Sequence, residues 1–193
     1  NGNPSTFYFT KDIADEVMQA DGIAQATEQT YISSLAAACC AEKLQIIGYD
    51  PDTDFVIEPW VASQFEGPLE DGQMIAGANV NVSTDGTIEL YGRSWPVVAQ
   101  LANTGTSLDN SVFINQNTVP DMVAASAKVS KQVMPAEYAG EAVSTVMIKT
   151  QQGYEAQTVA ENIKRLDSRF ADLEYVYPGG ITANTRTSLT ALA

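Results

Sequence analysis

Both ends of the chain carry the same succession of elements, a strand, a helix and a strand, and this arrangement constrains the fold more than any other feature of the sequence. Alternating and helical apolar patterns define these elements. They are predicted at residues 5–9, 11–20 and 23–35 at one end, and at residues 143–150, 153–170 and 173–176 at the other. Two such pieces around a long intervening block predict an α+β fold in which both chain ends complete one subdomain.

The middle of the chain predicts a second, β-rich subdomain inserted into the first. The predicted strands lie at residues 43–48, 73–77, 87–91, 95–101 and 111–114, and a helix is predicted at 119–129. Gly92, Arg93 and Ser94 are predicted to form the tight turn between residues 87–91 and 95–101. We therefore expect residues 1–49 and 141–180 to form one subdomain, residues 50–140 the inserted one, and residues 181–193 a tail.

The chain has no histidine among its 193 residues and carries a net charge of −14 at pH 7. Without histidine, Ser-His-Asp and Cys-His nucleophiles and all histidine-containing metal sites are excluded. The excess of acidic residues argues against binding to nucleic acid, because phosphates require a basic surface. It argues equally against binding to anionic lipids. Carboxylate, lysine or tyrosine chemistry stays open.

The two cysteines, Cys39 and Cys40, are adjacent within an apolar stretch. In a strand they would point to opposite faces, so a disulfide between them would distort the backbone. We interpret them as two small residues in a strand or its turn, with a redox pair or half of a metal site as the alternative. No apolar run reaches the roughly 18 to 20 residues of a membrane span. The absence of an initiator methionine and a signal peptide predicts an excised or mature fragment.

Two polar loops could carry chemistry. Residues 50–54, Asp-Pro-Asp-Thr-Asp, begin like a calcium loop, but Phe55 stands where the sharp turn needs glycine and Val61 where the bidentate glutamate belongs. An acidic turn is therefore preferred over a calcium site. Residues 104–109, Thr-Gly-Thr-Ser-Leu-Asp, could hold a metal or a nucleophile, but no base lies nearby in the sequence. The preferred interpretation is that these hydroxyls and this carboxylate close turns.

No phosphate-binding loop, dinucleotide fingerprint, nucleophile elbow or zinc-protease motif occurs, so the chain is not expected to hydrolyse ATP itself. Scattered aromatic residues could line a sugar or peptide site, although packing in the core or at its rim is the preferred interpretation. They are Tyr49, Trp60, Tyr91, Trp95, Tyr138, Tyr175 and Tyr177. The sequence therefore predicts no catalytic residue, no cofactor-binding residue and no metal ligand.

A series of short motifs, in their order along the chain, resembles the extracytoplasmic domain of MacB-like and FtsX-like ABC transporter permeases. The motifs are Leu-Gln-Ile-Ile-Gly-Tyr-Asp-Pro at 44–51, Met-Ile-Ala-Gly at 74–77, Gly-Thr-Ile-Glu-Leu-Tyr-Gly at 86–92, Trp-Pro-Val-Val-Ala at 95–99 and Thr-Gly-Thr-Ser-Leu-Asp-Asn-Ser-Val-Phe-Ile at 104–114. Val-Met-Ile-Lys at 146–149, with the helix after Tyr154, resembles the closing β-α-β unit of that family. Asp85 and Ala99 depart from the usual pattern of that family.

The resemblance implies a non-catalytic domain on the extracytoplasmic face of the cell membrane, with a porter-like β-α-β subdomain formed by both chain ends. Such a domain lies between two membrane helices of the permease and transmits ATP-driven motion. The implied partners are a second permease copy, an ABC ATPase subunit reached through the membrane segments, and an extracytoplasmic adaptor or substrate. No cofactor and no nucleic acid is implied. The alternative functions are a secreted binding module or a carboxylate-dependent hydrolase.

The same resemblance implies where the chain ends lie. Phe7 and the segment after Val176 should emerge on one side of the domain, and residues 181–193 should form a juxtamembrane tail. The isolated domain should be monomeric or weakly dimeric, because the membrane segments and the ATPase hold much of the permease dimer together.

Overall fold

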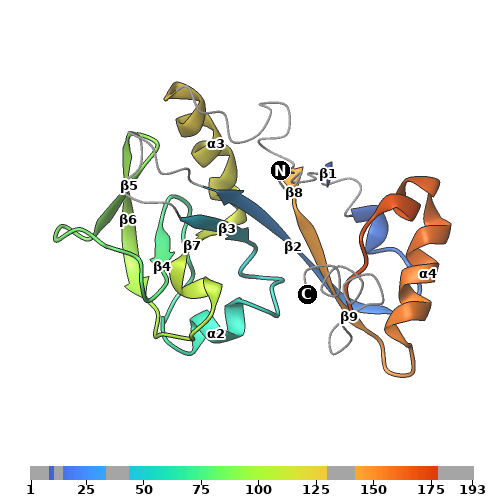
Figure 1. The fold of residues 1–193 in the computed structure, drawn as a ribbon. Coiled ribbons are helices and arrows are strands. Elements are labelled where there is room, and N and C mark those ends of the chain that lie inside the picture. The colour runs from blue at the N-terminus through green and yellow to red at the C-terminus, as the bar shows by residue number, and fades with distance from the viewer. Residues whose placement is uncertain (1–8, 11–14, 34–43, 130–141, 178–193) are drawn as a thin grey trace, which may run out of the picture. The chain divides into compact units, whose positions relative to one another are not determined.

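The computed structural model describes residues 9–10, 15–33, 44–129 and 142–177. Contacts divide the chain into two compact units, residues 1–14 with 26–147 and residues 15–25 with 148–193. The described elements are β1 (Phe9–Thr10), β2 (Ile23–Ser33), β3 (Gln45–Tyr49), α2 (Glu58–Ala62), β4 (Met74–Ala76), β5 (Thr87–Leu90), β6 (Arg93–Gln100), β7 (Ser111–Asn115), α3 (Val119–Lys128), β8 (Ala142–Val143), β9 (Thr145–Thr150) and α4 (Ala156–Leu166), with the short 3-10 helices η1 (Ser107–Asn110), η2 (Gln116–Thr118) and η4 (Ser168–Asp172) (Figure 1).

A mixed seven-stranded sheet runs in the order β5-β6-β4-β7-β3-β2-β9. Strand β3 pairs with β7, and β4 with β6, in parallel, while β2 with β3, β4 with β7 and β5 with β6 are antiparallel. Strands from the two ends of the chain lie side by side, as predicted. Strand β2 neighbours β9 in the seven-stranded sheet, and β1 pairs with β8 in a two-stranded sheet. The α+β class predicted from the sequence is confirmed.

The central strands of the sheet bury both of their faces. On β7, Val112 and Ile114 enter one apolar cluster, while Phe113 between them enters a second. The same alternation places Ile46 in the first cluster and Ile47 in the second. Side chains of a strand alternate between faces, so the two clusters lie on opposite sides of the sheet. Helix α3 covers the first cluster and α2 the second (Figure 1).

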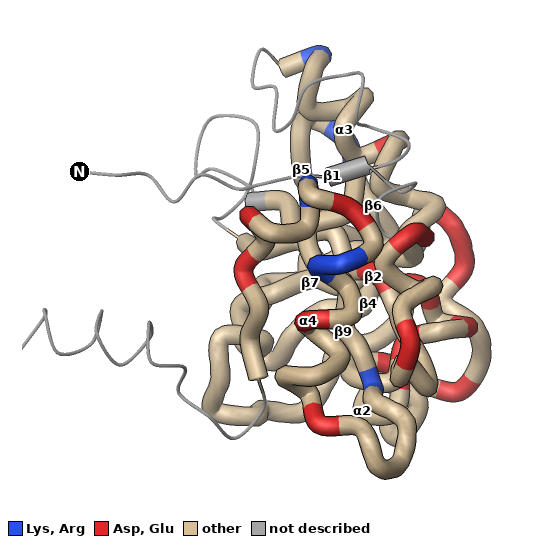
Figure 2. The backbone as a smooth tube through the Cα atoms, turned by 90° about the vertical axis from the view of Figure 1, so that its right-hand side faces the viewer, with Lys and Arg blue, Asp and Glu red and all other residues tan. Residues whose placement is uncertain are grey.

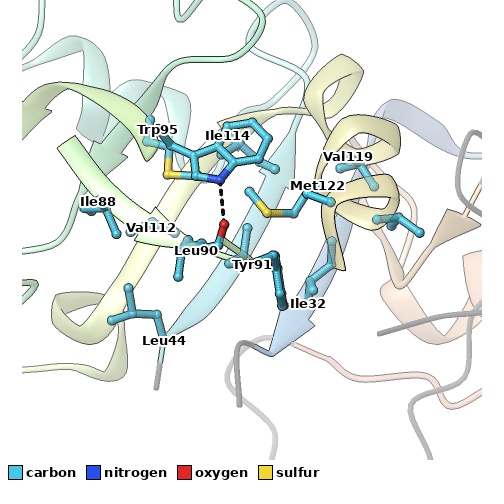
Figure 3. Packing of buried hydrophobic residues seen from close by; sticks show 14 of the residues in the cluster. Ile32, Leu44, Ile88, Leu90, Tyr91, Trp95, Val112, Ile114, Val119 and Met122 are labelled. Atoms are coloured by element: carbon cyan, nitrogen blue, oxygen red, sulfur yellow. Dashed lines mark hydrogen bonds between the residues drawn. The ribbon is translucent and has the colours of Figure 1, made fainter. Parts of the chain in front are cut away.

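Trp95 is the largest side chain of the first cluster and is fully buried. Its indole Nε1 donates a hydrogen bond of 3.1 Å to the carbonyl oxygen of Leu90, so the ring is buried without an unsatisfied polar atom (Figure 3). Met122 of α3 and Ile114 of β7 belong to the same cluster (Figure 3). The β5–β6 hairpin is thereby attached to the face of the sheet that α3 covers.

The hairpin turn differs from its prediction. Tyr91 and Gly92 form a two-residue turn with φ of 53° and 68°, and Arg93 and Ser94 already belong to β6. Positive φ at both turn positions is the pattern of a type I′ hairpin, whose twist matches that of the flanking strands. The predicted turn therefore begins one residue too late and ends two residues too late, because only Gly92 carries an obvious turn signal.

In the second unit, the predicted helix at 153–170 is shorter than expected. Helix α4 ends at Leu166, because Asp167 adopts an extended conformation and its carboxylate accepts a hydrogen bond of 2.8 Å from the backbone of Arg169. The η4 turn follows, and Arg169 forms a 2.8 Å ion pair with Glu16. The first helix, predicted at residues 11–20, ends at Val17 in the structure, and the turn that follows reaches Gly22, which has a positive φ of 93°.

The closing strand predicted at residues 173–176 is wrong, because this segment forms no strand in the structure. The backbone instead follows the η4 turn, where the Leu173 amide donates to the carbonyl oxygen of Phe170 at 3.3 Å. The Tyr175 hydroxyl donates to the same oxygen at 2.9 Å, and the Val176 side chain is 75% exposed. An apolar stretch without a neighbouring strand lacks the ladder partners that a strand requires.

Two further elements differ from the sequence analysis. Helix α2 lies where no helix was predicted. The strand predicted at 143–150 is divided into β8 and β9 at Ser144, whose amide donates to the Gln29 carbonyl at 2.9 Å while its hydroxyl accepts from the Tyr31 amide at 2.8 Å. The Ser144 hydroxyl thus takes the place of a backbone carbonyl as the acceptor for the Tyr31 amide of β2.

The predicted subdomain boundaries, residues 1–49 with 141–180 and 50–140 between them, differ from the two compact units and stay a prediction. Cys39, Cys40, Tyr138, Phe7 and the tail at 181–193 lie outside the described residues. The expectation about the positions of the chain ends therefore also stays a prediction.

Gly77 lies so close to the backbone of η1 that a substitution at this position tests the fold. A Cβ at this position would meet the Leu108 carbonyl oxygen and, at 2.7 Å, the Asp109 carbonyl oxygen, both in the backbone of η1. We expect Gly77→Ala to lower the free energy of unfolding by about 3 kcal/mol, because backbone atoms cannot rotate away. Urea unfolding monitored by circular dichroism measures this value.

Gly72→Ala provides the control, since a Cβ there meets nothing within 4 Å although φ is 81°. It should cost about 1 kcal/mol from left-handed strain alone. Equal losses in the two variants would contradict the packing of Gly77 against η1.

Candidate functional site

The acidic turn at residues 50–54 starts helix α2. The amides of Thr53 and Asp54 donate to the Asp50 carbonyl oxygen at 3.3 and 2.9 Å, which closes the turn. The Oδ1 atom of Asp54 then accepts from the amides of Val56, Ile57 and Glu58 at 2.8, 2.5 and 3.0 Å. These are the amides that the first turn of a helix leaves without partners. The preferred interpretation of residues 50–54, an acidic turn, is confirmed.

A chain of buried polar groups connects this turn to β2. The Nε2 atom of Gln29 donates to Oδ2 of Asp54 at 2.8 Å, and the Tyr31 hydroxyl donates to Oε1 of Gln29 at 2.7 Å. The hydroxyls of Thr27 and Thr53 lie 3.1 Å apart. Gln29, Thr27 and Asp54 are all buried, so these bonds remove the penalty of unsatisfied polar groups. They also fix the turn against the face of β2 that carries Tyr31.

The two tyrosines of this region stay protonated. Burial, together with the nearby Glu58, raises the pKa of Tyr49 far above its usual value, and the Tyr49 hydroxyl donates to Oε2 of Glu58 at 3.0 Å. Burial and the charge of Asp54 also raise the pKa of Tyr31. Burial raises the pKa of Glu58, and the charges of Asp54 and Asp52 add to this effect, while the hydrogen bond from Tyr49 opposes it. Both phenols are therefore hydrogen-bond donors and not bases.

An apolar cavity of about 310 Å³ lies against this network. The sheet, the α2 region and the loop before β7 each contribute to its lining. The lining residues are Gln29, Tyr31, Ile47 and Met147 from the strands, Val56, Ile57 and Trp60 from the α2 region, and Thr104, Thr106 and Leu108 from the loop. The Trp60 ring meets Phe113 edge to face, with centroids 5.6 Å apart and an interplanar angle of 80°. This contact holds Trp60 over the second apolar cluster.

Asp109 closes the loop that forms the third wall of the cavity. Its Oδ1 atom accepts from the amide and the hydroxyl of Thr104, both at 2.8 Å, and its Oδ2 atom accepts from the Gly105 amide at 2.7 Å. Burial alone would raise the pKa of Asp109, but these hydrogen bonds outweigh it and hold that pKa below its usual value. The preferred interpretation of residues 104–109, a loop closed by its own side chains, is confirmed.

The candidate aromatic residues do not converge on one site. Tyr49, Tyr91 and Trp95 are buried in the two clusters, and among the candidates that the structure describes only Trp60 lines the cavity. The sequence analysis missed Gln29 and Tyr31. No pattern in the sequence marks them, because both alternating faces of β2 carry polar residues, Gln29 on one face and Glu28 and Thr30 on the other.

The distribution of charged residues indicates no second candidate site within the described residues. Acidic residues greatly outnumber basic ones along the described backbone (Figure 2). No group of three or more histidine, cysteine, aspartate or glutamate side chains that could hold a metal ion is present within residues 9–10, 15–33, 44–129 and 142–177. The acceptors of Asp54 and Asp109 are occupied by protein donors.

Comparison with known proteins establishes the fold. The sequence matches no known family profile and no curated protein. The structure is similar to the periplasmic region of MacB from Actinobacillus actinomycetemcomitans, with a TM-score of 0.50 and 12% sequence identity over 89% of this chain and 82% of that one. It also matches the extracellular domain of the noncanonic ABC-type transporter YknZ from Gram-positive bacteria, with a TM-score of 0.49 and 12% identity over 89% and 88% of the two chains. The resemblance seen in the sequence motifs is confirmed as a likeness of fold to MacB.

Asp54 generates the second test. Asp54→Ala removes the acceptor of three amides and of Gln29, so we expect the free energy of unfolding to fall by about 3 kcal/mol. Asp52→Ala is the matched control in the same turn, because Asp52 is exposed, and it should change the value by less than about 0.5 kcal/mol. Chemical unfolding at pH 7 measures both. A loss for Asp54→Ala no larger than that of the control would refute the assigned network.

Proposed function

We propose that this chain is a non-catalytic extracytoplasmic domain of an ABC transporter of the MacB type. The observation that carries the proposal is the likeness of its fold to the periplasmic region of MacB, which extends over 89% of this chain. The order of the sequence motifs at 44–51, 74–77, 86–92, 95–99 and 104–114 supports it independently of the structure.

The chemistry of the described residues supports a non-catalytic role. The chain has no histidine, and the two best-buried carboxylates, those of Asp54 and Asp109, accept hydrogen bonds from several protein donors. A general base must be free to take a proton from its substrate. Tyr31 and Tyr49 are held protonated by their surroundings. A carboxylate-dependent hydrolase is therefore the weaker alternative.

The proposed role is mechanical. The domain transmits ATP-driven motion from the membrane part of the permease and contacts a substrate or a partner protein outside the cell membrane. Its partners are a second permease copy, an ABC ATPase subunit reached through the membrane segments, and an extracytoplasmic adaptor or substrate. No helix within the described residues is both long enough and apolar enough to cross a membrane.

The cellular position of the domain tests the proposal. In cells that make the whole native protein, Asp71→Cys places a thiol on an exposed loop between α2 and β4. We expect a membrane-impermeant maleimide to label this thiol in intact cells as fully as after lysis, because the loop faces away from the cytoplasm.

The unsubstituted protein gives the background from its own cysteines, and a cytoplasmic protein in the same cells shows that the membrane is intact. Labelling of Asp71→Cys that requires lysis would exclude an extracytoplasmic domain.

A further inference from the structure

The apolar cavity has the architecture of a binding site and not of a packing gap. Its residues come from three separate elements, the strand floor, the α2 region and the loop at 104–108. Each wall is fixed by its own contacts: Asp54 holds the start of α2 to Gln29, and Asp109 closes the loop. A concave site with walls positioned by separate hydrogen-bond networks is preformed, so ligand binding requires little reordering.

The side-chain polar atoms of Gln29, Tyr31, Thr104 and Thr106 in the lining are already engaged. Gln29 uses its amide nitrogen on Asp54 and its oxygen on the Tyr31 hydroxyl. The Thr104 hydroxyl donates to Asp109, and the Thr106 hydroxyl accepts from the Leu108 amide at 3.2 Å. No aspartate, glutamate, lysine or arginine is among the lining residues. A charged ligand would therefore lose its hydration without gaining a partner, whereas an apolar ligand would lose nothing.

The volume sets the size of the ligand. The cavity measures about 310 Å³, near the lower end of small-molecule sites. An apolar cavity of roughly 150 Å³ suffices to hold benzene. The cavity thus has room for a bicyclic aromatic ring or a branched hydrocarbon group. Val56, at 48% exposure, lies where the lining meets the solvent.

We propose that this cavity binds a small uncharged molecule through one aromatic ring system. The side chains of Trp60, Ile47 and Leu108 and the flexible Met147 supply the contacts. Met147 adapts its shape to the ligand, because its side chain is unbranched and polarisable. This inference goes beyond the proposed function, since it depends on the cavity alone and not on the transporter assignment.

Methionine methyl groups provide a direct readout with internal controls. The chain has five methionines, of which Met147 lines the cavity while Met74 and Met122 are buried in the first cluster on the opposite face of the sheet. In the 193-residue chain labelled with ¹³C at the methionine methyl groups, indole is the probe. We expect a saturable shift of the Met147 signal, with the signals of Met74 and Met122 unchanged. The loss of one signal in Met147→Leu assigns the resonance.

A matched pair of variants localises the binding. Val56→Lys places a charge at the mouth of the cavity, and Val98→Lys places the same charge at an exposed valine of β6 that does not line it. We expect Val56→Lys to weaken indole binding at least fivefold and Val98→Lys to leave it unchanged. Both valines are partly exposed, so neither change should prevent folding.

Two results would overturn the proposal. One is a Met147 signal that does not move or does not saturate. The other is equal weakening by the two lysine variants.

Discussion

The structure depends on the burial of both faces of its central strands. Consecutive residues such as Ile46 and Ile47, or Val112 and Phe113, enter different apolar clusters, so each strand requires a cover on each side. Full burial of one such side chain contributes about 1.5–3 kcal/mol. Helix α3 and the β5–β6 hairpin supply one cover and α2 supplies the other.

The buried residues of the sheet change from apolar to polar at β2, and the candidate site lies beside this strand. The faces of β3 and β7 are apolar, whereas β2 buries Thr27, Gln29 and Thr30. These polar residues need partners, and the turn at 50–54 provides them on the Gln29 side. The same hydrogen bonds that satisfy β2 therefore position α2, and α2 supplies one wall of the cavity. A loss at Asp54 should affect stability and the cavity together.

The sequence predicted what local pattern determines and missed what distant contacts determine. Strands β3 and β7 each contain a short apolar run, at residues 46–47 and 112–114, so their positions were clear. Helix α2 has five residues and depends on the Asp54 side chain for its start, so no periodicity marks it. Residues 173–176 carry a strand-like composition but have no strand partner. The cavity unites residues from Gln29 to Met147, and a single sequence does not show which of them meet.

The proposed function requires that the domain moves with the ATPase cycle of a MacB-type transporter. The most direct measurement is the distance between spin labels at Asp71→Cys in two copies of the full native complex in membranes, with and without a non-hydrolysable ATP analogue. The account predicts that the distance distribution shifts when the nucleotide binds. An unchanged distribution in a complex that hydrolyses ATP would contradict it.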